Sequence, residues 1–345
     1  MFVSGNQIRP CCEFTGSIRA LDSEKLRQIK YQLINNEFPV ECIKCKSKEK
    51  AFGHSLRTSS LASYSLPSDV TPEYSDITRL SIDTGNICNL LCLPCNGNSS
   101  YIRGVELNKI NSVPIIKARA DMDLQRFANV NFTNLTLSGG EPFADKVTFE
   151  FLNQLVASGR APAIKLNLIS NLTMITEDKL KFLTSNFAEV YISGSIDGVG
   201  AVNEYLRYPS NWSTIENTIA IMQQFPCLGF CITTALTNLS VLRYYELLEW
   251  ANGKSILDKF ITTVGDPREL TSYILPAEIK QKLLPVYEKL SLENPIANVC
   301  VEICKDETDY SDKFKQTIQW CIEHDKLRNT NIFDVFPELK AYDKT

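Results

Sequence analysis

Short apolar segments alternate with helix-like segments from residue 77 onward, and this alternation constrains the fold most strongly. Strand candidates lie at 77–83, 131–137, 163–170, 189–196, 228–235 and 260–264. Helix candidates between them lie at 99–110, 146–158, 177–185, 212–224 and 240–251. Parallel strands need such crossover connections, so the pattern predicts βαβ units and a parallel sheet. The six predicted strands are too few for a closed TIM barrel, and we expect an α/β fold with a partial, TIM-like (β/α)6 barrel.

The chain divides into three predicted parts. We expect an N-terminal cysteine-containing module at 1–75, the partial barrel core at 76–267 and a helical C-terminal extension at 268–345. A Ser-rich stretch at 55–71 is typical of a linker or surface loop. The aromatic residues at 333–342 predict that the extension packs back on the core.

Three helix candidates lie outside the barrel core, at 23–36, 276–292 and 314–326. In the N-terminal candidate, apolar residues recur roughly on one helical face. The second candidate contains Pro285, which predicts a kink there.

Composition narrows the class of protein. Apolar residues make up 44% of the 345 residues, which is enough for a sizeable core. The net charge of −4 gives no basic excess, so general nucleic-acid binding is not expected. Residues 1–10 lack a signal-peptide core and no long apolar run predicts a membrane span, so we expect a cytoplasmic protein without a membrane partner. Twelve cysteines then indicate metal or thiol chemistry, while only two histidines, His54 and His324, disfavour a histidine-based site.

Cys88, Cys92 and Cys95 form a C-x3-C-x2-C motif directly after the first of these predicted strands. Because a [4Fe–4S] cube is usually held by four thiolates, three close-set thiolates leave one iron open. A zinc site is the alternative, but structural zinc usually takes four ligands in two pairs, and no histidine lies nearby. The motif therefore predicts a cluster whose open iron can take part in chemistry.

The segment Gly139-Gly140-Glu141 follows the next predicted strand. Two glycines let a ligand approach the backbone closely, and the neighbouring carboxylate can bind an ammonium group. Asn171 and Asp197 end two further strands, where turn chemistry is the alternative interpretation of both residues. Their shared location favours a ligand site, because ligands gather at the carboxyl ends of parallel strands.

These motifs together resemble those of the radical S-adenosylmethionine (SAM) superfamily. The resemblance implies that the methionine amino group of SAM contacts the Gly139–Glu141 segment. It also implies cofactor contacts at the ends of the third and fourth predicted strands and at a following arginine, namely Asn171, Ser193, Ser195, Asp197 and Arg207. Many members have an aromatic residue before the third cysteine, where this chain has Pro94. That departure puts the stacking of adenine in doubt and leaves the cluster unaffected.

Cys11, Cys12, Cys42 and Cys45 form a second group of cysteines. The C-x-x-C pair at Cys42 and Cys45 is a common half-site for zinc or an iron–sulfur cluster. The surrounding sequence, and the C-terminal segment 329–339, resemble radical SAM proteins of the twitch or SPASM-like subgroup. This resemblance implies an auxiliary iron–sulfur cluster held by Cys42, Cys45 and at least one of Cys11 and Cys12. Zinc stays open as the alternative metal.

The resemblance implies the reaction. Reductive cleavage of SAM would give a 5′-deoxyadenosyl radical that abstracts a hydrogen from the substrate. A donor such as flavodoxin or ferredoxin would supply the electron, and the auxiliary cluster would assist. A peptidyl residue is the first substrate hypothesis, and a sugar, nucleoside or other small metabolite is the second. A non-enzymatic iron–sulfur electron carrier or a zinc-stabilised binding protein is the alternative class.

Five further cysteines belong to neither group. Cys227 and Cys231 flank an apolar strand, which predicts that both are core residues. Cys300, Cys304 and Cys321 could supply a ligand, but free cysteine is often simply buried.

Overall fold

The computed structural model describes residues 1–4, 7–18, 24–52, 55–58, 78–118, 127, 130–256 and 258–343. Its strands are β1 (Phe2–Ser4), β2 (Gln7–Arg9), β3 (Arg79–Asp83), β4 (Asn134–Ser138), β5 (Lys165–Ser170), β6 (Glu189–Ser195), β7 (Leu228–Leu236) and β8 (Lys259–Thr263). The helices up to the last strand are α1 (Glu24–Ile34), α2 (Ile43–Phe52), α4 (Tyr101–Asn111), α5 (Lys146–Ala157), α6 (Glu177–Asn186), α7 (Ala201–Leu206), α8 (Trp212–Met222), α9 (Asn238–Val241) and α10 (Tyr244–Gly253). After β8 follow α11 (Ala277–Ser291), α12 (Asn298–Lys305), α13 (Ser311–Arg328) and α14 (Ile332–Val335).

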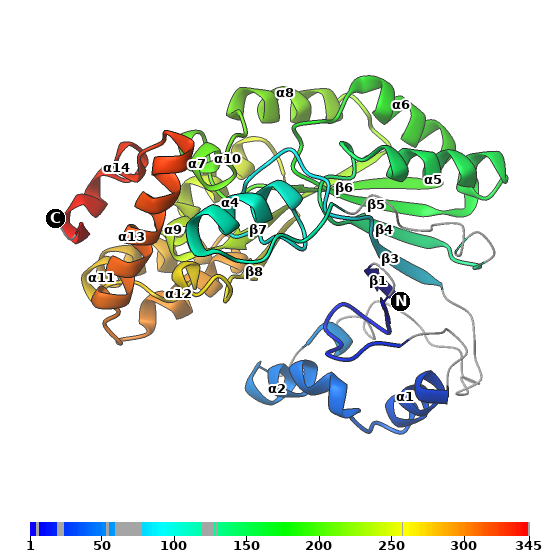
Figure 1. The fold of residues 1–345 in the computed structure, drawn as a ribbon, viewed down its shortest axis with the longest axis horizontal. Helices are drawn as coiled ribbons and strands as arrows, with labels where there is room; N and C mark the ends of the chain where they lie inside the picture. The colour runs from blue at the N-terminus through cyan, green and yellow to red at the C-terminus, as the bar shows by residue number, and fades with distance from the viewer. Residues whose placement is uncertain are drawn as a thin grey trace.

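The described strands form one eight-stranded sheet in the order β2-β1-β3-β4-β5-β6-β7-β8. Every neighbouring pair from β1 across to β8 is parallel, and only β1 and β2 pair antiparallel. No pairing joins β8 to β2 among the described residues, so the sheet is open (Figure 1). The predicted α/β fold with an open parallel sheet is confirmed, and the six predicted strands correspond to β3 through β8.

Two short strands at the N-terminus were not predicted. In β1, Val3 pairs with Ile82 of β3 in parallel register, so the start of the chain joins the core sheet. A three-residue strand is too short to show the alternating pattern by which strands are recognised in sequence. The predicted module boundary at residue 75 stays a prediction, since residues 59–77 lie outside the described part of the chain.

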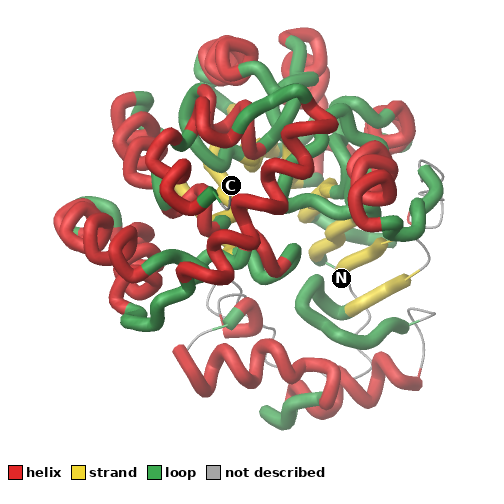
Figure 2. The backbone as a smooth tube through the Cα atoms, turned by 60° about the vertical axis from the view of Figure 1, so that its left-hand side comes forward, coloured by secondary structure: helices red, strands yellow, loops and turns green. Residues whose placement is uncertain are grey.

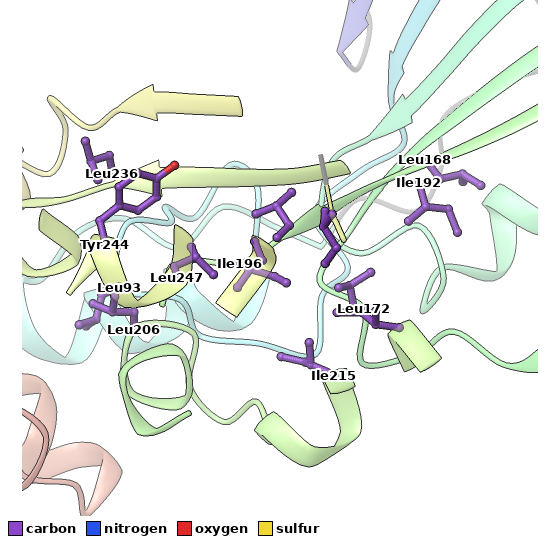
Figure 3. Close-up of a cluster of buried hydrophobic side chains, with 14 of the residues drawn as sticks. Leu93, Leu168, Leu172, Ile192, Ile196, Leu206, Ile215, Leu236, Tyr244 and Leu247 are labelled. Atoms are coloured by element: carbon purple, nitrogen blue, oxygen red, sulfur yellow. The ribbon is translucent and has the colours of Figure 1, made fainter. Parts of the chain in front are cut away.

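The core lies on one face of the sheet. In β4, Leu135 and Leu137 are buried while Asn134 and Thr136 on the other face are partly exposed. Figure 1 shows α5, α6 and α8 along one side of the sheet and the N-terminal α1 and α2 on the opposite side, and Figure 3 shows part of the buried cluster. Because one face is apolar and the other polar, the strands alternate instead of being continuously apolar.

The aromatic segment near the C-terminus packs against α7. Phe336 and Leu339 are fully buried, and the ring of Phe336 contacts the ring of Tyr205 in α7 at a centroid distance of 6.4 Å. Pro285 lies inside α11. Figure 2 shows the C-terminus among helices and the N-terminus beside strands. Among the described residues, none of the helices has the length and apolar character that crossing a membrane requires.

The cysteines outside the two predicted groups are mostly core residues. The structure buries Cys231, Cys300, Cys304 and Cys321. Cys227 is exposed, so its prediction as a core residue is wrong. It lies in the turn before β7 begins at Leu228, outside the alternation that directs a strand residue to the core. Of the two histidines, His324 is buried in α13 and His54 lies outside the described residues.

Candidate functional site

A cavity of about 290 Å³ opens at the carboxyl ends of the strands. Strands β4 to β7 each contribute residues at or near their carboxyl ends, and the loop after β3 contributes three cysteines. The lining residues are Cys88, Leu90, Cys92, Pro94, Cys95, Asn96, Ser99, Ser138, Gly139, Gly140, Ile169, Ser170, Asn171, Ser195, Arg207, Ala235 and Val264. This edge is where open α/β sheets bind their ligands.

The cysteine loop, residues 88–95, is held against the end of α7. The backbone N–H of Leu91 donates to the carbonyl of Tyr208 at 2.6 Å, and that of Leu93 donates to the carbonyl of Leu206 at 2.7 Å. The side chains of Leu93 and Leu206 lie together in the buried cluster (Figure 3). Leu91 and Leu93 are thus fixed on either side of Cys92, and all three cysteines of the loop line the cavity.

The three thiols of this loop are in an environment that disfavours their charged form. Burial raises the pKa of Cys88 to about 11 and that of Cys95 to about 12, and it also raises the pKa of Cys92. Metal ligation requires thiolates, and a bound metal centre supplies the positive charge that stabilises them. Three soft donors around one cavity therefore fit the ligand set of an iron–sulfur cluster.

A single metal ion fits less well. Among the described residues, no three His, Cys, Asp or Glu side chains are arranged to bind one ion. In a [4Fe–4S] cube, each thiolate binds a different iron, so the thiolates need not converge on one ion. The arrangement therefore disfavours a zinc site and does not disfavour a cluster.

Arg207 lines the cavity and carries one buried donor without a partner among the described residues. Its Nη1 donates to Asp197 Oδ2 at 2.8 Å, while its Nε is buried without a hydrogen-bond partner among the described residues. Asp197 does not line the cavity, and its other oxygen accepts from the backbone N–H of Ala235 at 2.8 Å. Arg207 is thus oriented by Asp197 and keeps one N–H for an anion such as a carboxylate.

Glu141 is held by hydrogen bonds to the end of β5. It is 1% exposed and does not line the cavity. One carboxylate oxygen accepts from the hydroxyl of Ser170 at 2.9 Å, and the other accepts from the backbone N–H of Asn171 at 2.6 Å. Burial raises the pKa of Glu141 although these hydrogen bonds favour the carboxylate. In this structure, Glu141 fixes the end of β5 behind the cavity wall.

Gly139 and Gly140 let two backbone segments meet. Gly139 has φ +127°, and a Cβ on Gly140 would lie 2.0 Å from the carbonyl oxygen of Ile87. The N–H of Gly140 donates to the carbonyl of Gly85 at 2.8 Å, and the N–H of Glu141 donates to that of Ile87 at 2.8 Å. These glycines therefore let the chain pack closely against the segment that leads into the cysteine loop. Both glycines also line the cavity.

The remaining predicted contacts divide into two groups. Asn171 and Ser195 line the cavity. The Nδ2 of Asn171 donates to Asn89 at 2.9 Å and lies 3.9 Å from the sulfur of Cys88. Ser193 lies deeper along β6, where its hydroxyl donates to Asn167 at 3.1 Å. Ser193 is not among the lining residues, because side chains two positions apart on one face lie at different depths.

The N-terminal cysteines gather in a second group. Cys11 and Cys42 pack against the small apolar cluster of Ile8, Phe14, Ile18 and Ile29. Burial, followed by the neighbouring Cys11 and Cys45 thiolates, raises the pKa of Cys42 to about 11. Burial, followed by charges that include the Cys11 and Cys45 thiolates, also raises the pKa of Cys12. The structure thus brings the four predicted thiols near one another, with Cys12 exposed and Cys45 buried.

A second hollow of about 360 Å³ lies at the opposite ends of the strands. Its lining includes Lys165 and Glu189, which form an exposed ion pair at 2.6 Å, and Cys227. None of the predicted site residues lines it. We place the chemistry in the smaller cavity, where the cysteines and Arg207 converge.

A buried ionic cluster that was not predicted lies behind the cysteine loop. Arg103, Glu106 and Arg328 are at most 7% exposed. Arg103 and Glu106 follow the loop in α4 at helical i, i+3 spacing, which is a local signal. Arg328 lies 222 residues from Glu106, and no pattern in the sequence connects the two.

No protein-family model and no curated protein matches the sequence. Similar solved structures include native anSMEcpe with bound AdoMet, at 19% identity and a TM-score of 0.46 over 63% of this chain and 62% of that one. Streptococcus suis SuiB bound to S-adenosylmethionine matches at 13% identity and a TM-score of 0.43 over 81% and 64% of the two chains. SuiB bound to the precursor peptide SuiA matches at 14% identity and a TM-score of 0.42 over 94% and 70%.

The chain spans about 62% of the length of anSMEcpe. Similarity at this level does not by itself assign an activity.

Proposed function

We propose that this chain is a radical SAM enzyme whose catalytic cluster is bound by Cys88, Cys92 and Cys95. The observation that carries the proposal is one cavity at the carboxyl edge of an open parallel sheet, lined by three cysteines and by an arginine with a free N–H. A [4Fe–4S] cluster held there would supply one electron to SAM, whose S–C5′ bond then breaks to methionine and a 5′-deoxyadenosyl radical.

The residues of the chain bind and orient SAM in this proposal. Arg207 donates to the SAM carboxylate, and Asp197 holds the guanidinium in place. Ser195 and Asn171 offer a hydroxyl and an amide beside the cavity, and Gly139 and Gly140 expose backbone atoms to the ligand. Glu141 keeps the end of β5 in position from behind.

We propose a peptidyl residue as the substrate, on the basis of the sequence resemblance, and a sugar, nucleoside or other small metabolite as the second candidate. We further propose that Cys42, Cys45 and at least one of Cys11 and Cys12 bind an auxiliary iron–sulfur cluster, and that a flavodoxin or ferredoxin reduces the catalytic cluster in the cytoplasm.

Cleavage of SAM tests the proposed function. The protein is reconstituted anaerobically with iron and sulfide, reduced with dithionite and incubated with SAM. We expect 5′-deoxyadenosine and methionine in the products by liquid chromatography. If protein with a full complement of cluster forms neither product, the chain is not a radical SAM enzyme.

Replacing Arg207 tests how SAM is bound. We expect Arg207→Gln to weaken SAM binding about 10- to 100-fold, because a charge-assisted hydrogen bond contributes roughly 1.5–3 kcal/mol. Equilibrium dialysis with labelled SAM measures the dissociation constant. The double variant Arg207→Gln/Asp197→Asn avoids a buried unpaired carboxylate and should show the same weakening. Wild-type affinity in the double variant would rule out a role for Arg207 in binding.

Replacing Cys42 tests the proposed division between two clusters. We expect Cys42→Ala to lower the iron content per chain while SAM cleavage without substrate persists, since the catalytic cysteines are unchanged. Iron and sulfide counting, together with 5′-deoxyadenosine formation, measures both effects. Cys227→Ser is the control, because Cys227 is exposed and outside both cysteine groups. Loss of SAM cleavage with unchanged iron content would reject this division.

A further inference from the structure

Two buried arginines bind backbone carbonyls of the cysteine loop. Arg328, at the end of α13, donates from Nη2 to the carbonyl of Leu91 at 2.5 Å. Arg103, in α4, donates from Nη2 to the carbonyl of Leu93 at 3.1 Å and from Nε to that of Cys95 at 3.3 Å. The N–H groups of Leu91 and Leu93 thus bind carbonyls at the end of α7. The carbonyls of Leu91, Leu93 and Cys95 bind guanidinium groups.

Glu106 joins the two arginines. Its Oε1 accepts from Arg328 Nε at 2.7 Å, and its Oε2 accepts from Arg328 Nη2 at 2.7 Å and from Arg103 Nη1. Burial alone would raise the pKa of Glu106, but the two arginines outweigh it and lower that pKa. The cluster of three side chains therefore contains two positive charges and one negative charge, a net charge of +1.

The surroundings keep water away from these charges. Arg103 is fully buried, and its guanidinium lies over the ring of Trp320 at 5.6 Å from the centroid. The ring of Trp320 in turn lies 3.9 Å from the ring of His324, at a tilt of 45°, and His324 is also fully buried. Charges in such a place interact more strongly than at a surface, because water does not screen them.

The net positive charge lies against the metal-binding loop. Arg328 donates to the carbonyl of Leu91, and Arg103 donates to the carbonyls of Leu93 and of the predicted ligand Cys95. A buried net charge is costly unless an opposite charge lies nearby. Thiolates and a reduced cluster would supply that opposite charge, and the one electron added on reduction would strengthen the attraction.

We infer that Arg103, Glu106 and Arg328 are positioning residues that set the reduction potential of the cluster at Cys88, Cys92 and Cys95. This inference rests on the proposed function. The hydrogen bonds fix the loop, and the net positive charge favours the reduced cluster. Because Arg328 belongs to the C-terminal extension, the extension contributes to the reduction potential of the cluster.

An EPR-monitored redox titration of the reconstituted protein without SAM tests this inference. We expect Arg328→Gln to make reduction about tenfold less favourable, a shift of about 59 mV to a more negative potential for a one-electron couple. Arg328→Lys keeps the charge and should restore most of the wild-type potential. Glu106→Gln removes the negative charge and should shift the potential in the opposite, positive direction.

Arg243→Gln is the matched control. Arg243 also pairs with a residue of the extension, Glu338, at 2.5 Å, but it has no hydrogen bond to the cysteine loop. Its replacement makes the same charge change and should leave the potential unchanged.

The signs of the shifts separate an electrostatic role from a structural one. If Arg328→Gln and Glu106→Gln shift the potential in the same direction, or neither shifts it, the inference is wrong. Where these variants bind the cluster and cleave SAM with unchanged potentials, the inference fails while the proposed function stands. Where the wild type binds no cluster, the proposed function itself fails.

Discussion

Chains with Cys92→Ser are expected to lose the catalytic cluster and to form no 5′-deoxyadenosine above the buffer background. Cys92 is the most deeply buried of the three cysteines of the loop, at 7% exposed. Losing one of three thiolates removes a direct ligand of the cluster. The loss should therefore exceed the roughly 10- to 100-fold effect of replacing residues that only support metal ligands. Cys88→Ser and Cys95→Ser should behave in the same way.

Two measurements check this expectation. Iron content after anaerobic reconstitution reports cluster binding, and liquid chromatography reports SAM cleavage. Cys227→Ser, with an exposed cysteine outside both groups, should match the wild type in both. A Cys92→Ser protein that keeps wild-type iron content and activity would place the catalytic cluster elsewhere.

Gly140→Ala is expected to destabilise the protein and to prevent cluster assembly. The added Cβ would lie 2.0 Å from the carbonyl oxygen and 2.5 Å from the carbonyl carbon of Ile87, which are backbone atoms that cannot rotate away. The segment before the cysteine loop must shift, and its two hydrogen bonds to Gly140 and Glu141 are lost or distorted. Overpacking of this kind costs about 1–3 kcal/mol or more.

Urea unfolding of the metal-free protein, followed by circular dichroism, measures this cost. Gly253→Ala is the matched control, because no atom lies within 4 Å of the Cβ position at that glycine of α10. A glycine-to-alanine change in a helix should be neutral or stabilise the protein by up to about 1 kcal/mol. Equal unfolding free energies for the two variants would show that the close contact at Gly140 does not matter.

Much of the fold could be predicted because its signals are local. The alternation of apolar and polar residues marks β3 to β8, and the helices between them show their own periodicity. The helices α2, α7, α12 and α14 were not predicted. Helices α7, α12 and α14 have six, eight and four residues, which is too few to show a helical period. Helix α2 is longer but carries few apolar residues to mark a buried face. Strands β1 and β2 have three residues each, too few to show a period.

The residues of the site could be predicted in part. The directions in which their side chains point could not be predicted from the sequence. The positions of Glu141 and Asn171 could be predicted because both residues follow predicted strands. The structure brings the two residues together. In the folded protein, Asn171 lines the cavity, whereas Glu141 does not line it and accepts a hydrogen bond from the backbone of Asn171. The contact between Arg328 and Glu106 depends on how the C-terminal extension packs on α4, which local patterns do not specify.

The EPR spectrum of the reduced protein, recorded with and without SAM, tests the central claim most directly. Binding of SAM to an open iron changes the electronic environment of the cluster at Cys88, Cys92 and Cys95. We therefore predict that SAM alters the spectrum of the reduced wild type and of a Cys42→Ala protein, which lacks the auxiliary site. A spectrum of the fully reconstituted, reduced protein that is identical with and without saturating SAM would contradict an open iron at this cavity.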